Sequence, residues 1–488
     1  MLGGLYLTLP QVILQSTTTQ NDLVVAFFVM GGTYFLLDWL KNALRPKVSI
    51  ILSAISYAIS LGVKATSFYF FIGLILSIGI LIILKKISLK LIIYWGLVTV
   101  LSFLLLSSPA YVLNLIHFGS PLGSRSFLHS EAGVLGEDNL LDKLRINSYR
   151  FVYHLISLDG FPFSIQKKFN KIKSEFAKNY PNIFDTSSRY VKDPYGETFT
   201  LSPKIANSED FSWFGPLAPL LILPAIMLSA IKILHDRDPL IMILLISGLV
   251  SFFLVTILRP GYDPYQGRYL NTSVAVLFPL SSLLFTRQSP RSIVMSIILF
   301  LSLIPLFFVT VANDAKPLIT VSISKKLYNS DCGKVLNTKY LCFVSSLIPE
   351  RIISDNFPNK PSILGFESRI ARQTYTFRSQ FRIFSLIETL PSNSKISIIL
   401  SEGDWEYPYF GSSFQHKVYP IPNPTHITTQ NLELLGVNYL VVHNKDVDIN
   451  KIKFPYKLIY IIPGNEVDWY VFRLEENQYL NNYEFSVF

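Results

Sequence analysis

A cation at the mouth of an apolar segment is the residue of this sequence best suited to chemistry. Arg268 lies in the stretch YDPYQGRYLNTSVAVLFPL (262–280), where polar residues give way to a long apolar run. A basic side chain at the edge of a membrane span is costly unless it is paired or functional. Because a guanidinium binds phosphate oxygens through two parallel hydrogen bonds, the sequence predicts that Arg268 binds the phosphate or pyrophosphate of a lipid-linked substrate.

Five further residues are candidates for the same phosphate site. They are two other cations of short loops and three polar neighbours of Arg268, namely Lys64, Arg259, Gln266, Tyr265 and Tyr269. A lysine adds a point charge, the tyrosines and the glutamine donate hydrogen bonds, and Gly267 lets backbone approach closely. The alternative is that the cations reach bulk anionic phospholipid and that the tyrosines belong to an interfacial aromatic belt.

A second polar group lies near the N-terminus, in LQSTTTQNDLVVAFF (14–28). Gln20, Asn21 and Asp22 are predicted to form part of a polar site between two apolar runs. The alternative is local: Thr19 caps the following helix and Asp22 occupies the capping-box position.

A third group, GDWEYPYFG (403–411), follows a predicted strand at 395–400. Ligand sites of α/β sheets favour the carboxyl ends of strands. Aromatic rings can stack on sugars and carboxylates can accept hydroxyl hydrogen bonds, so the candidate sugar or acceptor contacts are Asp404, Trp405, Glu406, Tyr407 and Tyr409. The alternative is a turn that packs in a domain core.

The elements that must position these residues are mostly membrane spans. Half of the 488 residues are apolar and 16% are charged, and the apolar runs precede residue 312. The sequence therefore predicts a polytopic α-helical membrane domain at 1–311 and an extramembrane domain at 312–488. The net charge of +10 is interpreted as a topology signal rather than as evidence for a nucleic-acid partner.

About eight full spans are predicted, at 23–40, 48–63, 66–84, 91–113, 213–234, 239–258, 268–286 and 292–311. Residues 48–84 are too long for one span, so Gly62 is predicted to break the helix and Lys64 to lie in the turn. A partial N-terminal segment, 2–15, is short and interrupted by Pro10.

Basic residues set the predicted orientation. They concentrate in alternate loops, as Lys41, Arg45 and Lys47; Lys85, Lys86 and Lys90; Lys232 and Arg237; and Arg287 and Arg291. The positive-inside rule makes these loops cytoplasmic. Residues 16–22, 114–212, 259–267 and the tail 312–488 then face outward.

The long outer loop, 114–212, contains an amphipathic pattern at 139–158. This pattern predicts a helix that either lies in the membrane surface or packs on the protein. Residues 167–193 are rich in Lys, Asn and Ser and are interpreted as a solvated loop or flap.

The tail alternates helix and strand patterns and predicts a small α/β domain. Helices are expected at 367–390 and 428–436, and strands at 395–400, 437–442, 456–462 and 468–474. Outside the cytosol, the only two cysteines, Cys332 and Cys342, would form a disulfide; the alternative is two thiols. The sequence has no metal-ligand spacing of Cys or His.

Several motifs together resemble a known superfamily. LQSTTTQND, GVKATS (62–67), NLIHFGSPLG (114–123), EDFSWFGPLAPLLILP (209–224), YQGRYL (265–270), DWEYPYFG and NYLVV (438–442) occur in the expected order. They are similar to bacterial GT-C membrane glycosyltransferases, of the dolichyl-phosphate-mannose protein mannosyltransferase and lipopolysaccharide-core and lipid A glycosyltransferase groups. The resemblance covers nearly all of the chain.

The resemblance implies an enzyme of the bacterial inner membrane. It would move a sugar from a polyprenyl-phosphate donor to a lipid, glycan or protein acceptor on the outer face, with Arg268 and Lys64 near the donor phosphate. No cofactor is implied with certainty, and a divalent metal ion is compatible with the family.

One departure affects the catalytic expectation. The family places an acidic residue in the first outer loop, whereas this sequence begins at what resembles the third span. Either Met1 is a misplaced start or a sign of a truncated gene, or the chain lacks the catalytic group, so the catalytic residue is unknown. The alternatives are an O-antigen polymerase or ligase, and a non-catalytic protein that binds or transports lipid-linked glycans.

Overall fold

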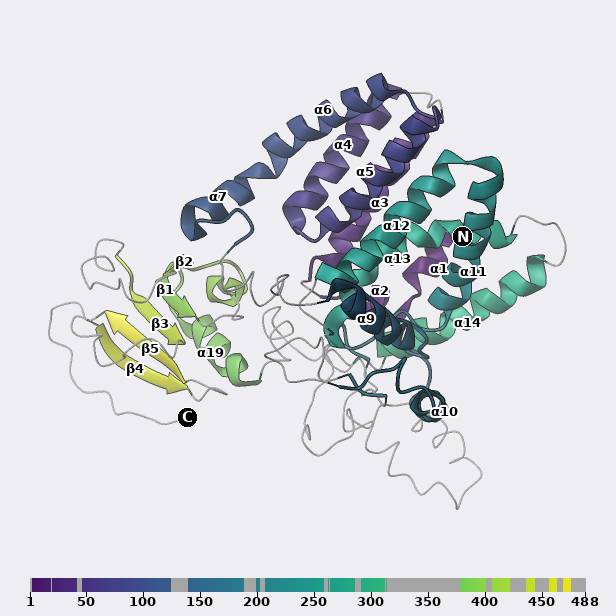
Figure 1. Ribbon diagram of the computed structural model, residues 1–488. Coiled ribbons are helices and arrows are strands. Elements are labelled where there is room, and N and C mark those ends of the chain that lie inside the picture. Colours follow the sequence, from purple (N-terminus) through teal and green to yellow (C-terminus); the bar gives the residue numbers. More distant parts are fainter. Residues whose placement is uncertain are drawn as a thin grey trace, which may run out of the picture. The chain divides into compact units, whose positions relative to one another are not determined.

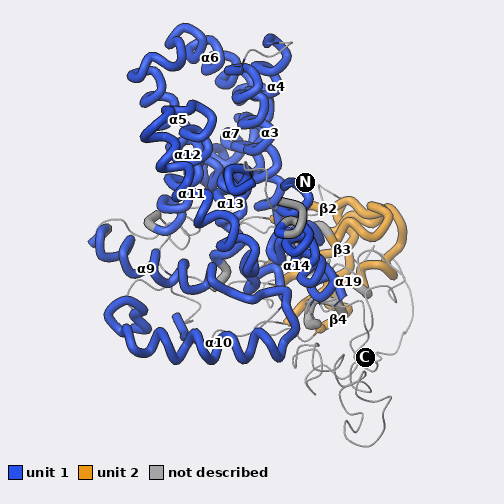
Figure 2. The backbone as a smooth tube through the Cα atoms, turned by 90° about the vertical axis from the view of Figure 1, so that its right-hand side faces the viewer, with its two compact units in different colours: residues 1–360 blue, residues 361–488 orange. Residues whose placement is uncertain are grey.

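The structure, a computed structural model, has two compact units, residues 1–360 and 361–488 (Figure 2). The residues that it describes are 2–18, 20–41, 46–123, 139–187, 199–201, 207–258, 262, 264–285, 291–311, 313, 378–400, 406–421, 436–443, 456–462 and 468–474. The domain boundary predicted after residue 311 adjoins a long stretch outside these ranges and stays a prediction.

The described part of the first unit is helical (Figure 1). Its helices are α1 (Leu2–Leu7), α2 (Pro10–Gln15), α3 (Asp22–Leu40), α4 (Pro46–Val63), α5 (Ser67–Ile83), α6 (Leu89–Leu106), α7 (Ser108–Phe118), α9 (Leu140–Leu155), α10 (Phe163–Lys178), α11 (Leu217–Asp236), α12 (Pro239–Leu258), η1 (Pro264–Leu270), α13 (Asn271–Leu277), η2 (Phe278–Phe285) and α14 (Arg291–Val311). Within the described ranges, five have the length and composition of membrane spans: α3, α4, α6, α11 and most of α12. Two shorter apolar stretches are α5 and residues 296–311.

Two details of the predicted spans are corrected by the structure. Residues 268–286 do not form one α-helix, because a short α-helix, α13, is flanked by the 3-10 helices η1 and η2. Pro279 lacks the N–H that an α-helix would use at this point. Gly62 does not break a helix but lies inside α4, where an added Cβ would come within 2.5 Å of the Ser107 hydroxyl oxygen.

The other breaks agree with the predictions. Pro10 is the first residue of α2, which separates this helix from α1. The chain between α4 and α5 turns at Lys64, as predicted.

The apolar helices pack through small residues and buried hydroxyls. An added Cβ on Gly73 of α5 would lie 2.7 Å from Cα of Ser247 in α12, so this glycine permits close approach of the two backbones. The Thr33 and Tyr57 hydroxyls of α3 and α4 are 3.0 Å apart. Such contacts satisfy polar groups where water is scarce.

The long loop 114–212 contains two helices among its described residues. α9 confirms the helix predicted at 139–158, and one of its faces packs on the protein: Arg150 is fully buried and donates to the Asp185 and Ser187 carbonyls at 2.8–3.1 Å. Its exposed residues include Leu141, Val152 and Ile156. The predicted solvated loop at 167–193 is wrong as far as Lys178, because α10 occupies that stretch.

The second unit confirms a small α/β arrangement. Its described elements are α19 (Arg378–Thr389), β1 (Lys395–Leu400), η4 (Tyr407–Phe410), β2 (Lys417–Pro420), β3 (Tyr439–His443), β4 (Tyr456–Ile462) and β5 (Trp469–Leu474). The sheet order is β2-β1-β3-β5-β4; β2, β1 and β3 are parallel, and β5 runs antiparallel to both of its neighbours. The sequence did not predict β2, and the helix expected at 428–436 lies almost wholly outside the described residues.

Candidate functional site

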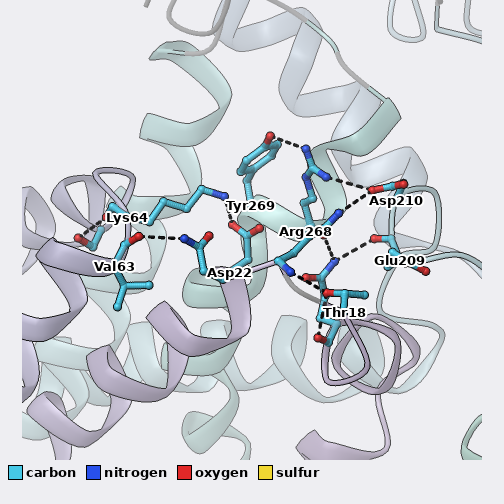
Figure 3. A network of polar contacts seen from close by, with 12 residues as sticks. Thr18, Asp22, Val63, Lys64, Glu209, Asp210, Arg268 and Tyr269 are labelled. Carbon is cyan, nitrogen blue, oxygen red and sulfur yellow. Dashed lines mark hydrogen bonds and ion pairs between the residues drawn. The ribbon is translucent and has the colours of Figure 1, made fainter. Parts of the chain in front are cut away.

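Four separate segments bring charged side chains together in the first unit (Figure 3). Asp22 is the first residue of α3, and Lys64 lies in the turn between α4 and α5. Arg268 and Tyr269 lie in η1, and Asp210 belongs to the segment 207–216 that leads into α11. These residues, with Gln20, are called the charged site below.

Lys64 forms one ion pair of the charged site. Its Nζ lies 2.7 Å from Oδ1 of Asp22, whose side chain is only 6% exposed, compared with 25% for that of Lys64. The neighbouring Asn21 donates from Nδ2 to the Val63 carbonyl at 2.9 Å. Two contacts therefore tie the start of α3 to the turn after α4.

Arg268 forms the other ion pair. Its Nη1 donates to Oδ1 of Asp210 at 3.0 Å, and its Nη2 donates to the Tyr269 hydroxyl at 2.8 Å. The side chains of Arg268 and Asp210 are 23% and 37% exposed. The guanidinium is thus held by neighbours on two sides and keeps partial access to its surroundings.

The Tyr269 ring lies near both cations. The Lys64 Nζ is 4.7 Å from the ring centroid and the Arg268 Cζ is 4.9 Å from it. Both distances are within the range of cation–π attraction. Both cations therefore lie near the centre of one aromatic ring, each with its own carboxylate partner.

Glutamines on the N-terminal side position Asp210. Gln20 donates from Nε2 to the Asp210 carboxylate at 3.0 Å, and its own carbonyl oxygen accepts from Gln15 at 2.7 Å. Gln11 and Gln15 both donate to the Glu209 carbonyl, at 2.9 and 3.0 Å. The buried polar side of α2 thereby fixes the segment that carries the counter-ion of Arg268.

The structure brings together six of the sequence-predicted site residues: Gln20, Asn21, Asp22, Lys64, Arg268 and Tyr269. Asn21 is the N-cap of α3 but makes no capping hydrogen bond with its side chain, and Thr19 lies outside the described residues. Gln266 is fully buried in η1. Gly267 does allow a close approach, to the Ser212 carbonyl at 3.1 Å from an added Cβ.

Other predicted site residues are not placed at the charged site. Arg259, Cys332, Cys342, Asp404 and Trp405 lie outside the described residues, and of Tyr265 and Tyr407 only the backbone is described. Glu406 is exposed in the second unit. Tyr409 is fully buried beside Phe384 and Trp469, which fits the alternative of a core turn.

Asp210 is the functional candidate that the sequence interpretation missed. The only signal for it in the sequence was that a cation at the end of an apolar run needs a partner of opposite charge. The pairing has a consequence: Asp210 accounts for the charge of Arg268 without a phosphate. Because Asp210 already pairs with Arg268, the position of this cation at the end of an apolar run is not by itself evidence for an anionic ligand.

A second polar cluster joins α9 to Trp213 and Tyr262. His154 is stacked between Trp213 and Tyr262, and its Nε2 lies 2.8 Å from the Tyr262 hydroxyl. The Trp213 backbone N–H donates to the Asp159 carboxylate at 2.6 Å. The segment 207–216 thus joins this cluster to the charged site.

Burial dominates the ionisation of this cluster. It lowers the pKa of His154 from 6.5 to about 3, with a smaller effect from the charge of Lys173. It also lowers the pKa of Lys173 to about 8, against the opposing charge of Asp159, and raises the pKa of Asp159. His154 is therefore neutral at physiological pH.

Among the residues that the structure describes, no group of three or more His, Cys, Asp or Glu side chains is placed to hold a metal ion.

A comparison with solved structures finds a weak structural likeness. The chain is similar to the crystal structure of the Archaeoglobus fulgidus oligosaccharyltransferase in the apo form, with a TM-score of 0.32 and 14% sequence identity. The match covers 86% of this chain and 52% of that one, so the chain spans about half the length of this neighbour. A likeness of this size says nothing about the activity of this chain. No family model and no curated protein matches it.

Proposed function

We propose that the chain is a membrane glycosyltransferase that takes a sugar from a polyprenyl-phosphate donor and passes it to a lipid, glycan or protein acceptor. Arg268 and Lys64 hold the donor phosphate, on the outer face of a bacterial inner membrane. The proposal rests on the order of the sequence motifs that resemble GT-C enzymes. It rests also on one geometric observation, the two cations that share the Tyr269 ring.

The chemistry would be a displacement at the anomeric carbon of the sugar. The bond between that carbon and the lipid phosphate breaks, and the acceptor oxygen takes its place. Negative charge develops on the departing phosphate, where cations held in place beforehand stabilise it. A carboxylate would take the proton of the acceptor hydroxyl.

The described residues supply the cationic half of this chemistry. Asp22 is not assigned as the base, because its carboxylate is almost fully buried and is held by Lys64 at 2.7 Å. An acceptor hydroxyl would have to displace that lysine to reach it. The catalytic base stays unassigned.

A donor phosphate must share Arg268 with Asp210 or displace Asp210 from it. A guanidinium carries five N–H donors arranged as a fork, so it can hold two anions on different edges. The partial exposure of Arg268 leaves room for the first arrangement.

The test measures binding of a polyprenyl-phosphate sugar to the full-length protein in nanodiscs. Arg268→Ala is expected to weaken binding by tenfold or more, since hydrogen bonds to charged groups contribute about 1.5–3 kcal/mol. Arg145→Ala is the matched control, because Arg145 also pairs with an aspartate, Asp142, at 2.8 Å but is well exposed. Unchanged binding in Arg268→Ala, with the melting temperature preserved, would refute the role.

A second candidate is a protein that binds lipid-linked glycans without transferring the sugar. The pairing of Asp22 with Lys64 favours it, because it leaves Asp22 unavailable as a base. Binding that depends on Arg268, with no transfer to any lipid, glycan or peptide acceptor, would support this candidate over the enzyme.

A further inference from the structure

Helix α10 presents an apolar stripe to its surroundings. Ile165, Ile172, Phe176 and, just beyond the helix, Tyr180 are 46%, 66%, 59% and 45% exposed. Their spacings of seven, four and four residues place them on one side of a helix. The exposed Phe176 and Tyr180 rings also contact each other, with centroids 5.0 Å apart.

The face of α10 that packs on the protein carries no large apolar side chain among its fully buried residues. Its buried residues are Gln166, Ser174 and Ala177. A helix on the surface of a soluble domain normally buries its large apolar residues and exposes its polar ones. In α10 the largest exposed side chains are instead apolar, and they lie on the side of the helix that adjoins the buried one.

Lysines occupy the exposed side of α10 that does not carry the apolar stripe, and Lys168 lies nearest to the stripe. The helix carries five lysines and one acid, Glu175, and Lys167, Lys168, Lys171 and Lys178 are exposed. The fifth, Lys173, donates from Nζ to the Tyr153 and Ile156 carbonyls at 3.0 and 2.9 Å. These carbonyls lie at the C-terminal end of α9, where a cation is favourable. Lys173 therefore attaches α10 to α9.

The direction of α10 fits a helix that lies along a bilayer. Figure 1 shows α10 end-on while α4, α5 and α12 are seen from the side, and Figure 2, turned by 90°, shows α10 along its length at one end of the helical unit. The axis of α10 thus runs crosswise to those apolar helices. A helix in this direction lies parallel to the surface of a membrane that the apolar helices cross.

We propose that α10 binds the surface of an anionic phospholipid bilayer. Ile165, Ile172 and Phe176 enter the headgroup region, Lys168 beside them contacts phosphate-bearing anionic headgroups, and the lysines of the polar face add longer-range attraction to the anionic surface. Exposed apolar residues combined with lysines are the composition of interfacial helices, and anionic lipid strengthens their binding. A soluble protein partner would match the apolar stripe but gives no reason for the excess of lysine on the polar face of the same helix.

The experiment uses the full-length protein with Cys332 and Cys342, its only cysteines, replaced by serine. An environment-sensitive fluorophore is attached to Phe176→Cys, or to Glu175→Cys as the matched control on the adjacent, charged side of the helix. The protein is placed in nanodiscs of phosphatidylcholine, with or without phosphatidylglycerol, that carry a spin-labelled quencher lipid.

The label at position 176 is expected to shift to the blue and to be quenched by the spin-labelled lipid, several-fold more than the label at 175. Phosphatidylglycerol should increase the quenching, and Lys168→Ala with Lys171→Ala should remove that increase. Quenching that is equal at the two positions overturns the proposal. So does a label at 176 that is shielded both from lipid and from aqueous iodide, because a protein surface then covers the stripe.

Hydrogen–deuterium exchange of the unmodified protein provides a second measurement that needs no substitution. Amides of residues 163–178 should exchange several-fold more slowly in nanodiscs containing phosphatidylglycerol than in those of phosphatidylcholine alone. Equal rates in the two membranes would contradict a role for anionic lipid.

Discussion

Replacing Asp210 by Asn separates the structural and the ligand-binding roles of the charged site. The amide oxygen of Asn can still accept from Gln20 and Arg268, so the substitution removes mainly the negative charge. Because the side chains of Arg268 and Asp210 are 23% and 37% exposed, the lost ion pair should cost at most about 1 kcal/mol of unfolding free energy.

The effect on the proposed donor has the opposite sign. A phosphate on the outer edge of the Arg268 guanidinium would lie roughly 7 Å from the Asp210 carboxylate, giving a repulsion of about 2.4 kcal/mol at an effective dielectric constant of about 20. Screening at physiological salt reduces this to about 1 kcal/mol. Asp210→Asn should therefore bind a polyprenyl-phosphate sugar about fivefold more tightly.

The assay is a titration of the full-length variants with the donor at two salt concentrations, alongside thermal melts. Asp142→Asn serves as the control, because it removes the partner of the exposed Arg145. The gain for Asp210→Asn should be larger at low salt. Weaker binding in a stably folded Asp210→Asn variant would refute the reasoning. It would mean that binding depends on the Asp210 carboxylate rather than on a direct contact between Arg268 and the phosphate.

Three further predictions concern stability. Asp22→Asn and Lys64→Met should be measured singly and together by thermal melts. Their effects on the free energy of unfolding should differ from additivity by about 1–2 kcal/mol, since the pair is only partly buried. Additive effects would show that this ion pair does not stabilise the fold. Below pH 6.5 the unfolded chain binds a proton at His154, whereas the folded chain binds it only near pH 3. This group should therefore lower the free energy of unfolding by about 1.4 kcal/mol for each pH unit of acidification between these values. Melting curves of His154→Phe should lack this component, and an unchanged pH profile would contradict the burial of a neutral imidazole. Gly73→Val should destabilise by about 1–3 kcal/mol because the new side chain meets backbone of α12, whereas Gly79→Val on the same helix has open space and should change the melting temperature little.

The hydrophobic pattern was sufficient to locate most apolar helices and most strands. The bounds of α3, α5, α12, β1 and β4 lie within one or two residues of the predicted ones, because runs of apolar or β-branched residues end at turn residues. The break at Pro279 was missed, because a long apolar run concealed a local change of helix type.

The error at α10 has a different cause. Its lysine-rich composition dominated the interpretation, although apolar residues recur at helical spacing from Ile165 to Phe176. Packing, rather than composition, decides whether such a segment is ordered. Here Lys173 and the small buried face of α10 supply that packing.

At the charged site, chemistry was easier to predict than pairing. Lys64 and Arg268 were recognisable from their types and their place at the ends of apolar runs. Their partners could not be ranked, because the choice of Asp210 for Arg268 depends on a long-range contact between α2 and the segment 207–216. Nothing in local sequence encodes that contact.

The segment 207–216 bears on how the protein can be engineered. A stretch without helix or strand just before an apolar helix, here α11, would ordinarily be a convenient place for an epitope tag or a protease site. Here Gln11, Gln15 and Asp159 form hydrogen bonds with its backbone. An insertion would therefore disrupt both the charged site and the cluster around His154. Tags are better attached elsewhere.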